Sequence, residues 1–269
     1  MADEVRPATD PRGASLETSA LLDRLPGVAA YDLTVVDTDR VTPSMQRIRL
    51  AADGLSDLAY EPGQDLMIAV PEGGTGHFRR RYTIRSLDRA TGTVELQIVV
   101  HGDGDGPGAR WAAGVAPGDT AEAIGPRGKV TLDPEADWHL FVGDESALPV
   151  TFAMVEALGR HQRAVVVLEV AGPDDVQPLA VPPGVDVDLR WLHRDGRPVG
   201  TGAALLEAVD ALRIPDGRGH AYVAGELRTV SALRRRLEGR NLAGERISAK
   251  PYWRLGVANA AHGEPPRPD

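Results

Sequence analysis

Cysteine is absent from the 269 residues of this sequence. Its absence excludes disulfide bonds, cysteine nucleophiles, thiolate zinc sites and cysteine-ligated iron–sulfur clusters. Any redox chemistry must therefore be carried by a bound organic cofactor or by a metal held through histidine and carboxylate groups. The seven histidines are dispersed and lack the i, i+4 spacing of a helical metal site, so we predict no metal bound by the protein itself.

Long apolar runs and an excess of basic residues are also missing. No segment approaches the roughly 18 consecutive apolar residues of a membrane span, and the first residues lack the apolar core of a secretory signal. We therefore expect a cytoplasmic protein without stable membrane insertion, and a monomer. The formal net charge of −9 argues against binding to nucleic acid, which requires a dominant positive field.

The pattern of apolar residues changes once along the chain. Short β-rich runs separated by Gly, Pro and Asp turns predict an antiparallel β-barrel over residues 29–134. From Trp138 onward, apolar runs alternate with helical patterns, which predicts a parallel α/β domain of Rossmann type over residues 135–257. We expect residues 1–28 to form a mobile extension and residues 258–269 a polar tail.

The stretch "HFRRRYTIRSLD" places four arginines around one tyrosine in an acidic chain. Because side chains alternate along a strand, Arg80 and Tyr82 should share one face, while Arg79 and Arg81 share the other. A tyrosine ring can lie against a flat cofactor, and an arginine can bind a phosphate through two hydrogen bonds. The alternative is a polar edge strand whose charges are simply solvated.

A glycine-rich segment, "HGDGDGPGARW", follows one strand later and precedes a helical turn. Backbone N–H groups that no side chain shields can bind a pyrophosphate in such a loop. The segment is not a Walker loop, because no Gly-Lys-Ser/Thr follows it. A flexible hairpin is the other interpretation of this segment.

The order of these motifs indicates a family. "RRRYTIRSLD", "HGDGDGPGARW", "VGDESALP", "AGELRTVSALRRRL" and "KPYWRLG" follow one another as in siderophore-interacting proteins, which the sequence resembles over roughly residues 31–256. Members of this family are FAD-containing ferric-siderophore reductases of the ferredoxin-reductase superfamily. The resemblance implies an N-terminal β-barrel that binds FAD and a C-terminal Rossmann-like domain that binds NADPH or NADH.

The resemblance also implies roles for individual residues at the FAD site. Tyr82 would pack on the isoalloxazine ring, Thr83 would lie near its reactive nitrogen, and Arg80 would contact the phosphates. Ala109 stands where many members have serine, so backbone N–H groups would replace a hydroxyl contact. The remaining residues that the resemblance assigns to FAD are Arg85, His101, Gly102, Gly106, Pro107 and Trp111.

Residues near the nicotinamide are implied in the same way. The resemblance assigns Gly143, Asp144, Glu145, Ser146, Gly225 and Glu226 to this cleft, with Trp253 as a second aromatic residue near the flavin. Without the resemblance, "VGDESALP" would be a capped strand-to-helix turn and Trp253 a core residue. The sequence leaves NADH against NADPH open, since either Arg190 or Arg194 could bind a 2′-phosphate.

The implied reaction passes electrons from the nicotinamide through FAD, one at a time, to the Fe(III) of a siderophore, and releases Fe(II). No side chain is assigned a catalytic role, because the chemistry belongs to the flavin. Anionic ferric chelates need local positive charge on an acidic protein, and Arg79, Arg81 and Lys250 flank the flavin motifs. The alternatives are a flavin reductase with a protein or flavin acceptor, and a siderophore-binding flavoprotein without turnover.

Overall fold

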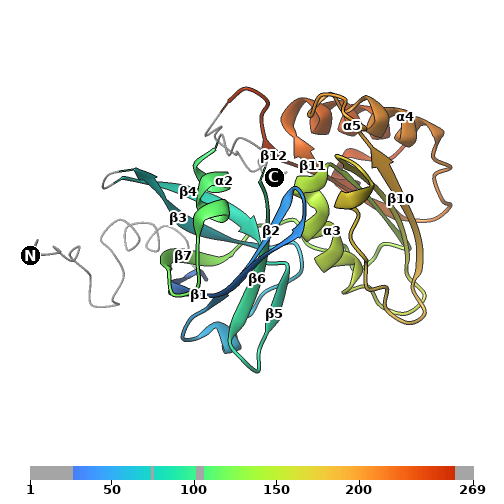
Figure 1. Cartoon of the computed structure of the whole chain (residues 1–269). Helices are drawn as coiled ribbons and strands as arrows, with labels where there is room; N and C mark the ends of the chain where they lie inside the picture. Colours follow the sequence, from blue (N-terminus) through green and yellow to red (C-terminus); the bar gives the residue numbers. More distant parts are fainter. Residues whose placement is uncertain (1–26, 74–75, 101–105, 258–269) are drawn as a thin grey trace, which may run out of the picture.

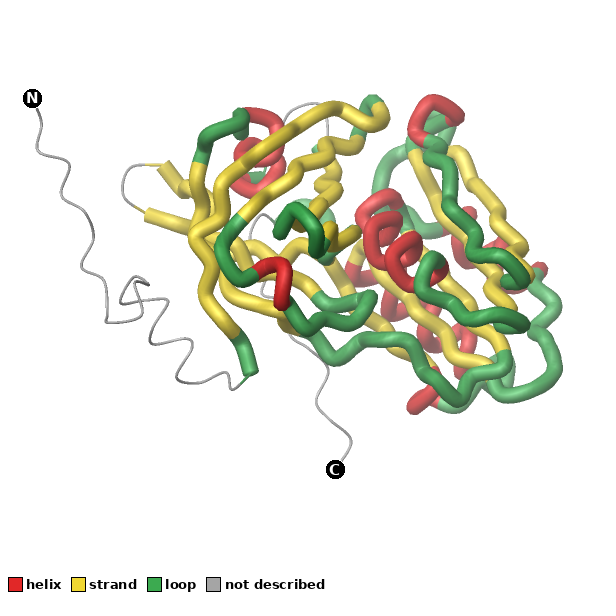
Figure 2. Tube along the Cα trace, turned by 90° about the horizontal axis from the view of Figure 1, so that it is seen from below, coloured by secondary structure: helices red, strands yellow, loops and turns green. Residues whose placement is uncertain are grey.

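The computed structural model describes residues 27–73, 76–100 and 106–257. Its two sheets lie side by side in Figures 1 and 2, with the antiparallel sheet at the N-terminal end of the chain. The predicted polar tail, nearly all of the predicted extension, and the candidates His101 and Gly102 lie outside the described residues. None of the helices in the described ranges has the length and apolarity needed to cross a bilayer.

The first sheet has seven strands in the order β4-β3-β7-β1-β2-β6-β5, and its described pairs are antiparallel. The edge strands β4 and β5 are consecutive in the sequence, and the Arg85 N–H between them donates to the Glu95 carbonyl of β6 at 2.9 Å. The sheet therefore curls on itself, which confirms the predicted antiparallel barrel. The strands are β1 (Ala29–Thr42), β2 (Met45–Ala51), β3 (Asp65–Gly73), β4 (Gly76–Thr83), β5 (Ser86–Asp88), β6 (Thr93–Val99) and β7 (Thr120–Arg127).

Alternation of apolar residues explains the core of the barrel. Val94, Leu96 and Ile98 of β6 are buried, and the residues between them are partly exposed, as expected for a strand with one face on the core. The helix α2 (Pro107–Gly114) begins with a proline in its first turn and packs beside β3 and β4. This placement brings the end of the glycine-rich segment next to the arginine-rich strand.

The second sheet has five parallel strands in the order β10-β9-β8-β11-β12. The strands are β8 (Trp138–Gly143), β9 (Arg163–Val170), β10 (Asp186–His193), β11 (Gly219–Glu226) and β12 (Ile247–Trp253). Strands β8 and β11 are buried along their whole length, as in parallel sheets that helices cover on both faces. The predicted Rossmann-like domain is confirmed, and the strand order reverses between β8 and β11, where such sheets bind ligands.

Within the described ranges, three helices cover the parallel sheet. The helix α3 (Leu148–Val155) packs with Phe141 on one face, while α4 (Ala203–Ala211) and α5 (Leu227–Glu238) pack with Leu140 and Val142 on the other. Figure 1 shows α3 on the side of the sheet that faces the barrel. Short 3₁₀ turns complete the fold at Leu55–Asp57 (η1), Glu145–Ala147 (η2), Pro173–Asp175 (η3) and Gly244–Arg246 (η4).

Contacts across α3 and the neighbouring loops join the two sheets. Met45 of β2 belongs to the same buried cluster as the α3 side chains. The Arg85 guanidinium donates two hydrogen bonds of 2.7 Å to the Glu156 carboxylate, and Ser44 donates from N and Oγ to Asp175 at 2.9 and 2.6 Å. These pairs fix the orientation of the barrel relative to the parallel sheet.

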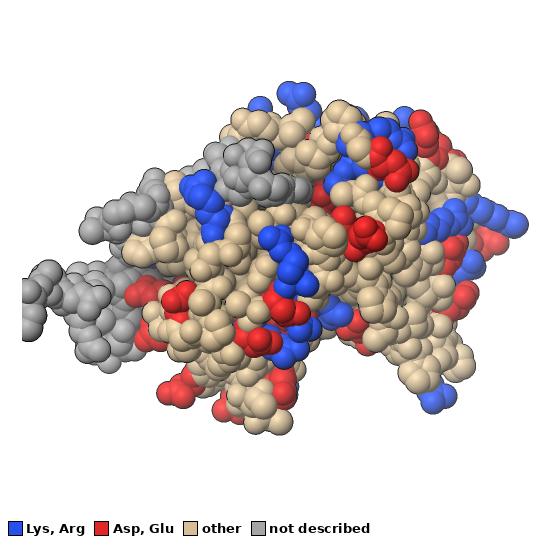
Figure 3. All heavy atoms as spheres, in the orientation of Figure 1, with Lys and Arg blue, Asp and Glu red and all other residues tan. Residues whose placement is uncertain are grey.

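Charges on the molecular surface are mixed. On the face shown in Figure 3, Lys and Arg side chains lie next to Asp and Glu side chains. Pairs along β1 and β2 have the same character, for example Arg47 with Asp39 at 2.6 Å. On this face and along β1 and β2, basic side chains therefore have acidic neighbours.

A buried histidine in β8 makes stability depend on pH. His139 is fully buried, its Nε2 accepts a hydrogen bond from the Gln162 amide at 3.3 Å, and its Nδ1 has no partner among the described residues. Burial, with a smaller effect of the nearby His220 charge, lowers the pKa of His139 to about 4. The folded protein therefore holds this ring neutral, whereas the unfolded chain protonates it near its ordinary pKa.

The pKa of His139 is lower in the folded protein than in the unfolded chain. Its neutral ring therefore contributes fully to the free energy of unfolding above about pH 6.5, and this contribution is lost as the pH falls toward about 4. We expect His139→Phe to reduce the loss of unfolding free energy on acidification by about 2 kcal/mol, measured by urea denaturation between neutral and acidic pH. The exposed His161, replaced by Asn, is the control. Identical acid sensitivity in the His139 variant and the native protein would contradict this assignment.

Candidate functional site

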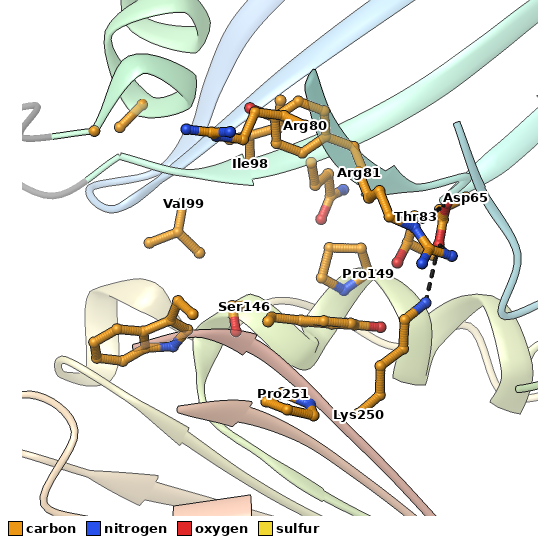
Figure 4. Close-up of a pocket in the computed structure, with 16 residues that line it drawn as sticks. Asp65, Arg80, Arg81, Thr83, Ile98, Val99, Ser146, Pro149, Lys250 and Pro251 are labelled. Carbon is orange, nitrogen blue, oxygen red and sulfur yellow. Dashed lines mark hydrogen bonds and ion pairs between the residues drawn. The ribbon is translucent and has the colours of Figure 1, made fainter. Parts of the chain in front are cut away.

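A cleft of about 290 Å³ opens between the barrel and the carboxyl end of the parallel sheet. One side is formed by β3, β4, β6 and the start of α2, and the other by η2, α3 and β12 (Figure 4). The sequence-predicted residues that line the cleft are Arg80, Arg81, Tyr82, Thr83, Gly106, Ala109, Ser146, Lys250 and Trp253. Segments far apart in the sequence therefore form one site.

Tyr82 lies between the cleft and α2. Its ring stacks on Trp111 of α2, with ring centroids 5.9 Å apart and an interplanar angle of 21°. A β-carbon at Gly108 would clash with the Tyr82 hydroxyl, so glycine permits this close approach of helix and strand. Trp111 thus supports Tyr82 from behind and is not itself a lining residue of the described cleft.

The barrel side presents hydrogen-bonding groups that the protein leaves unused. The Tyr82 hydroxyl and Arg80 Nη2 are buried, and neither has a hydrogen-bond partner among the described residues. Burial raises the pKa of Tyr82, so its hydroxyl stays protonated and can donate. Among the residues that the structure describes, no side chain caps the N-terminus of α2 at Gly106. Buried donors are normally satisfied, so their arrangement indicates a polar or anionic ligand.

On the opposite side, the buried carboxylate of Asp144 organises the ends of the parallel strands. It accepts hydrogen bonds from Ser146 N and Oγ at 3.0 and 2.5 Å, Glu226 N at 2.9 Å and Trp253 Nε1 at 2.9 Å. Burial, together with the Glu145 carboxylate, raises the pKa of Asp144. Asp144 does not line the described cleft, but it fixes Ser146 and Trp253, which do.

The end of β11 is shaped around the same carboxylate. Gly225 has a φ of +134°, and a β-carbon there would lie 2.5 Å from Asp144 Oδ2. The next residue, Glu226, accepts from the N–H groups of Arg228 and Thr229 at 2.6 and 3.0 Å and so caps α5. Gly143, Gly225 and Glu226 therefore shape and support the cleft from outside its described lining.

The structure removes Arg194 as a candidate for binding a 2′-phosphate. Its guanidinium is buried and donates two hydrogen bonds, of 2.6 and 2.7 Å, to Glu145, with Glu169 at 3.5 Å. Arg190 lies on the surface and pairs with Asp188 at 2.5 Å. Glu145 is thus occupied by an internal ion pair, which the sequence-based assignment to the nicotinamide cleft did not foresee.

Other arginine assignments also change. Strand alternation predicted that Arg81 would point away from Arg80 and Tyr82, yet all three line the cleft, because the site lies where β4 ends and the sheet curls. Arg79 is not a lining residue of the described cleft, and Arg85, predicted to contact FAD, pairs with Glu156 across the domains. Pro107 starts α2 behind the described lining.

Sequence reasoning missed Asp65, Gln97, Pro149, Pro251 and Tyr252, which also line the cleft. Asp65 is the most informative of them, since it is 1% exposed and binds both Arg81 and Lys250. In the sequence, Asp65 could have been noticed as an acidic residue at the start of the apolar run "DLMIAV". A charged residue in such a position is buried only when it has a partner.

Known proteins share the fold of this chain and identify its family. The architecture is shared with a ferredoxin reductase of carbazole 1,9a-dioxygenase, with a TM-score of 0.68 at 19% identity. Residues 60–130 match the family model of the siderophore-interacting FAD-binding domain, and residues 136–256 match that of the siderophore-interacting protein. The chain belongs to the siderophore-interacting protein family.

Individual relatives support this membership. The ferric vibriobactin reductase ViuB of Vibrio cholerae is 34% identical over 188 residues, which cover 69% of this chain and 68% of that protein. The NADPH-dependent ferric-chelate reductase of Escherichia coli is 26% identical, with 82% and 92% covered. A siderophore utilization protein from T. fusca has a TM-score of 0.78 at 32% identity, with 87% and 96% covered. The chain spans 65% of the length of a matched protein of Mycobacterium bovis, to which it is 37% identical.

FAD fits the residues that form the cleft. The unpartnered donors of Arg80 and Tyr82 suit an acceptor-rich ligand, and Gly108 and Ala109 keep side chains away from the start of α2. The opposite side offers Pro149 and Trp253, which suit a flat aromatic ring system. The family match and this donor set therefore agree on FAD as the cofactor.

Replacing Arg80 tests this assignment. We expect Arg80→Ala to raise the Kd for FAD by roughly 10- to 100-fold, because a hydrogen bond to a charged group is lost. Arg79→Ala, which removes a charge on the neighbouring residue outside the described cleft lining, should change the Kd far less. Titration of flavin fluorescence measures both values. Equal losses in the two variants would show that general charge, and not this contact, controls affinity.

Replacing Gly225 tests the packing around Asp144. Gly225→Ala should lower the free energy of unfolding by about 2–4 kcal/mol, since it adds both a strained φ and a clash. Gly114 is the last residue of α2 and is the matched control, because a β-carbon there would have no described atom within 4 Å. Chemical denaturation compares the two variants, and a neutral effect at Gly225 would contradict the described contact.

Proposed function

We propose that this protein is an FAD-dependent NAD(P)H:ferric-siderophore oxidoreductase. The observation that carries the proposal is the cleft between the two sheets, where Arg80 and Tyr82 hold buried donors that have no hydrogen-bond partner among the described residues. The barrel side would hold FAD through Arg80, Tyr82 and Thr83, and the start of α2 would receive its phosphates. A bound flavin supplies the conversion of a two-electron hydride into the single-electron steps that Fe(III) accepts.

The parallel sheet would receive the nicotinamide. Ser146, Pro149 and Trp253 line the cleft at its carboxyl edge, the usual ligand site of a doubly wound sheet. Asp144 holds the Ser146 hydroxyl and the Trp253 indole in place through the hydrogen bonds described above. Apolar residues on both sides of the cleft, among them Ile98, Val99 and Pro251, would limit the access of water to the reacting groups.

The charge of the cleft supports a ferric chelate as acceptor. Arg80, Arg81 and Lys250 line it together with the single acid Asp65, among the described residues, although the chain as a whole carries a net charge of −9. Local positive charge of this kind attracts anionic ligands to an otherwise repelling surface. A relative is named ferric vibriobactin reductase, which supports a ferric chelate as the acceptor of this protein.

The reaction is tested with flavin-loaded protein under anaerobic conditions. We expect NADH or NADPH to bleach the flavin absorbance, and ferric siderophores to be reduced much faster than ferredoxin, cytochrome c or free flavin. An Fe(II)-specific colorimetric chelator records the product. Comparison of the two nicotinamides at equal concentration also assigns the physiological donor.

Two outcomes would contradict the proposal. A flavin that no nicotinamide bleaches would indicate a siderophore-binding flavoprotein without turnover. Bleaching followed by rapid electron transfer only to a protein or free flavin would indicate a different reductase of the same fold.

A further inference from the structure

Asp65 is a buried carboxylate of the cleft that the proposed reaction does not use directly. It stands at the start of β3, and both of its oxygens accept from the Arg81 guanidinium, Nε to Oδ1 at 2.9 Å and Nη2 to Oδ2 at 2.8 Å. Lys250 Nζ donates to Oδ2 at 2.9 Å (Figure 4). The cluster of Asp65, Arg81 and Lys250 therefore joins the barrel to β12 at the edge of the cleft.

This cluster decides how much positive charge the cleft presents. The cationic lining residues in the described part of the chain are Arg80, Arg81 and Lys250, and Asp65 offsets one of their charges. Asp65 pairs with Arg81 and Lys250, whereas the Arg80 guanidinium points away from it in Figure 4, so the compensation falls on Arg81 and Lys250. The side chains of these two cations are only 15% and 13% exposed, which keeps them close to the carboxylate.

The geometry points to Asp65 as a residue that sets substrate specificity by charge. It fixes Arg81 and Lys250 at the cleft and holds the net charge of the three-residue cluster at +1, which limits the preference for strongly anionic ferric chelates over neutral ones. The inference rests on the proposed function, because it assumes that the chelate binds in this cleft. The Coulomb energy between a unit charge on the protein and a chelate roughly 10 Å away is proportional to the charge of the chelate. Removing the charge of Asp65 therefore changes the binding of a trianionic chelate and leaves that of a neutral one unchanged.

The variant Asp65→Asn keeps the shape of the side chain and removes its charge. Binding of two redox-inert Ga(III) chelates, a trianionic tris-catecholate and a neutral tris-hydroxamate, is measured calorimetrically on the flavin-loaded protein at low ionic strength. We expect the ratio of affinities to shift toward the trianion by roughly 5- to 10-fold. The shift should shrink as salt is added, which a purely structural role of Asp65 would not produce.

Three further variants control for charge and folding. Asp188→Asn removes the same charge from the exposed pair with Arg190 on β10 and should leave the ratio unchanged. The double variant Asp65→Asn/Lys250→Met restores the net charge of the cleft and should restore the native ratio. If Asp65→Asn does not fold, Lys250→Met in the native background provides the reverse test and should lower the preference for the trianion by a similar factor.

The outcomes separate this inference from the proposed function. If the native protein binds both chelates and neither Asp65→Asn nor Lys250→Met changes the ratio, the role of Asp65 is wrong and the reductase proposal stands. If the native protein binds neither chelate, both proposals fail. An equal shift in Asp188→Asn would assign the effect to overall charge and would also overturn the role of Asp65.

Discussion

The buried carboxylate of Asp144 is the interaction on which the α/β side of the site depends. It joins the end of β8 to Glu226 of β11 and to Trp253 of β12, residues 82 and 109 positions away in the sequence. Burial and the Glu145 carboxylate raise the pKa of Asp144, which means that they disfavour its charged form. A carboxylate removed from water therefore needs such donors to stabilise its charge. The requirement for glycine at position 225 and the position of the Trp253 ring both follow from this one buried group.

The two sides of the cleft differ in how their polar groups are satisfied. Asp144, Glu145 and Glu226 are bound by partners within the protein, so these carboxylates on the α/β side are satisfied without a ligand. Arg80 and Tyr82 on the barrel side retain buried donors without partners in the described structure. The barrel therefore supplies the unfilled binding groups, while the parallel sheet supplies a fixed surface against which a second ligand can be placed.

The two architectures were predictable from the sequence because the periodicity of apolar residues is a local property. Arg80 and Tyr82 could be proposed as binding residues because their strand and the glycine-rich segment are neighbours in the chain. Ion pairs between distant segments were not predictable in this way. Arg85 pairs with Glu156, Arg194 with Glu145, and Lys250 with Asp65, at separations of 71, 49 and 185 residues. In each pair an acidic side chain binds a basic side chain that the sequence alone left available for a ligand. Which of the two partners the basic side chain binds depends on the folded topology.

Transfer of electrons from the flavin to a ferric chelate is the central step of the proposed function, and this step can be isolated from the nicotinamide. The flavin-loaded protein is photoreduced anaerobically and titrated with a ferric tris-catecholate siderophore while the visible spectrum is recorded. We expect full reoxidation with the release of about two Fe(II) per flavin, because each Fe(III) accepts one electron. A flavin that stays reduced in excess ferric siderophore, yet is reoxidised by ferredoxin or cytochrome c, would contradict it.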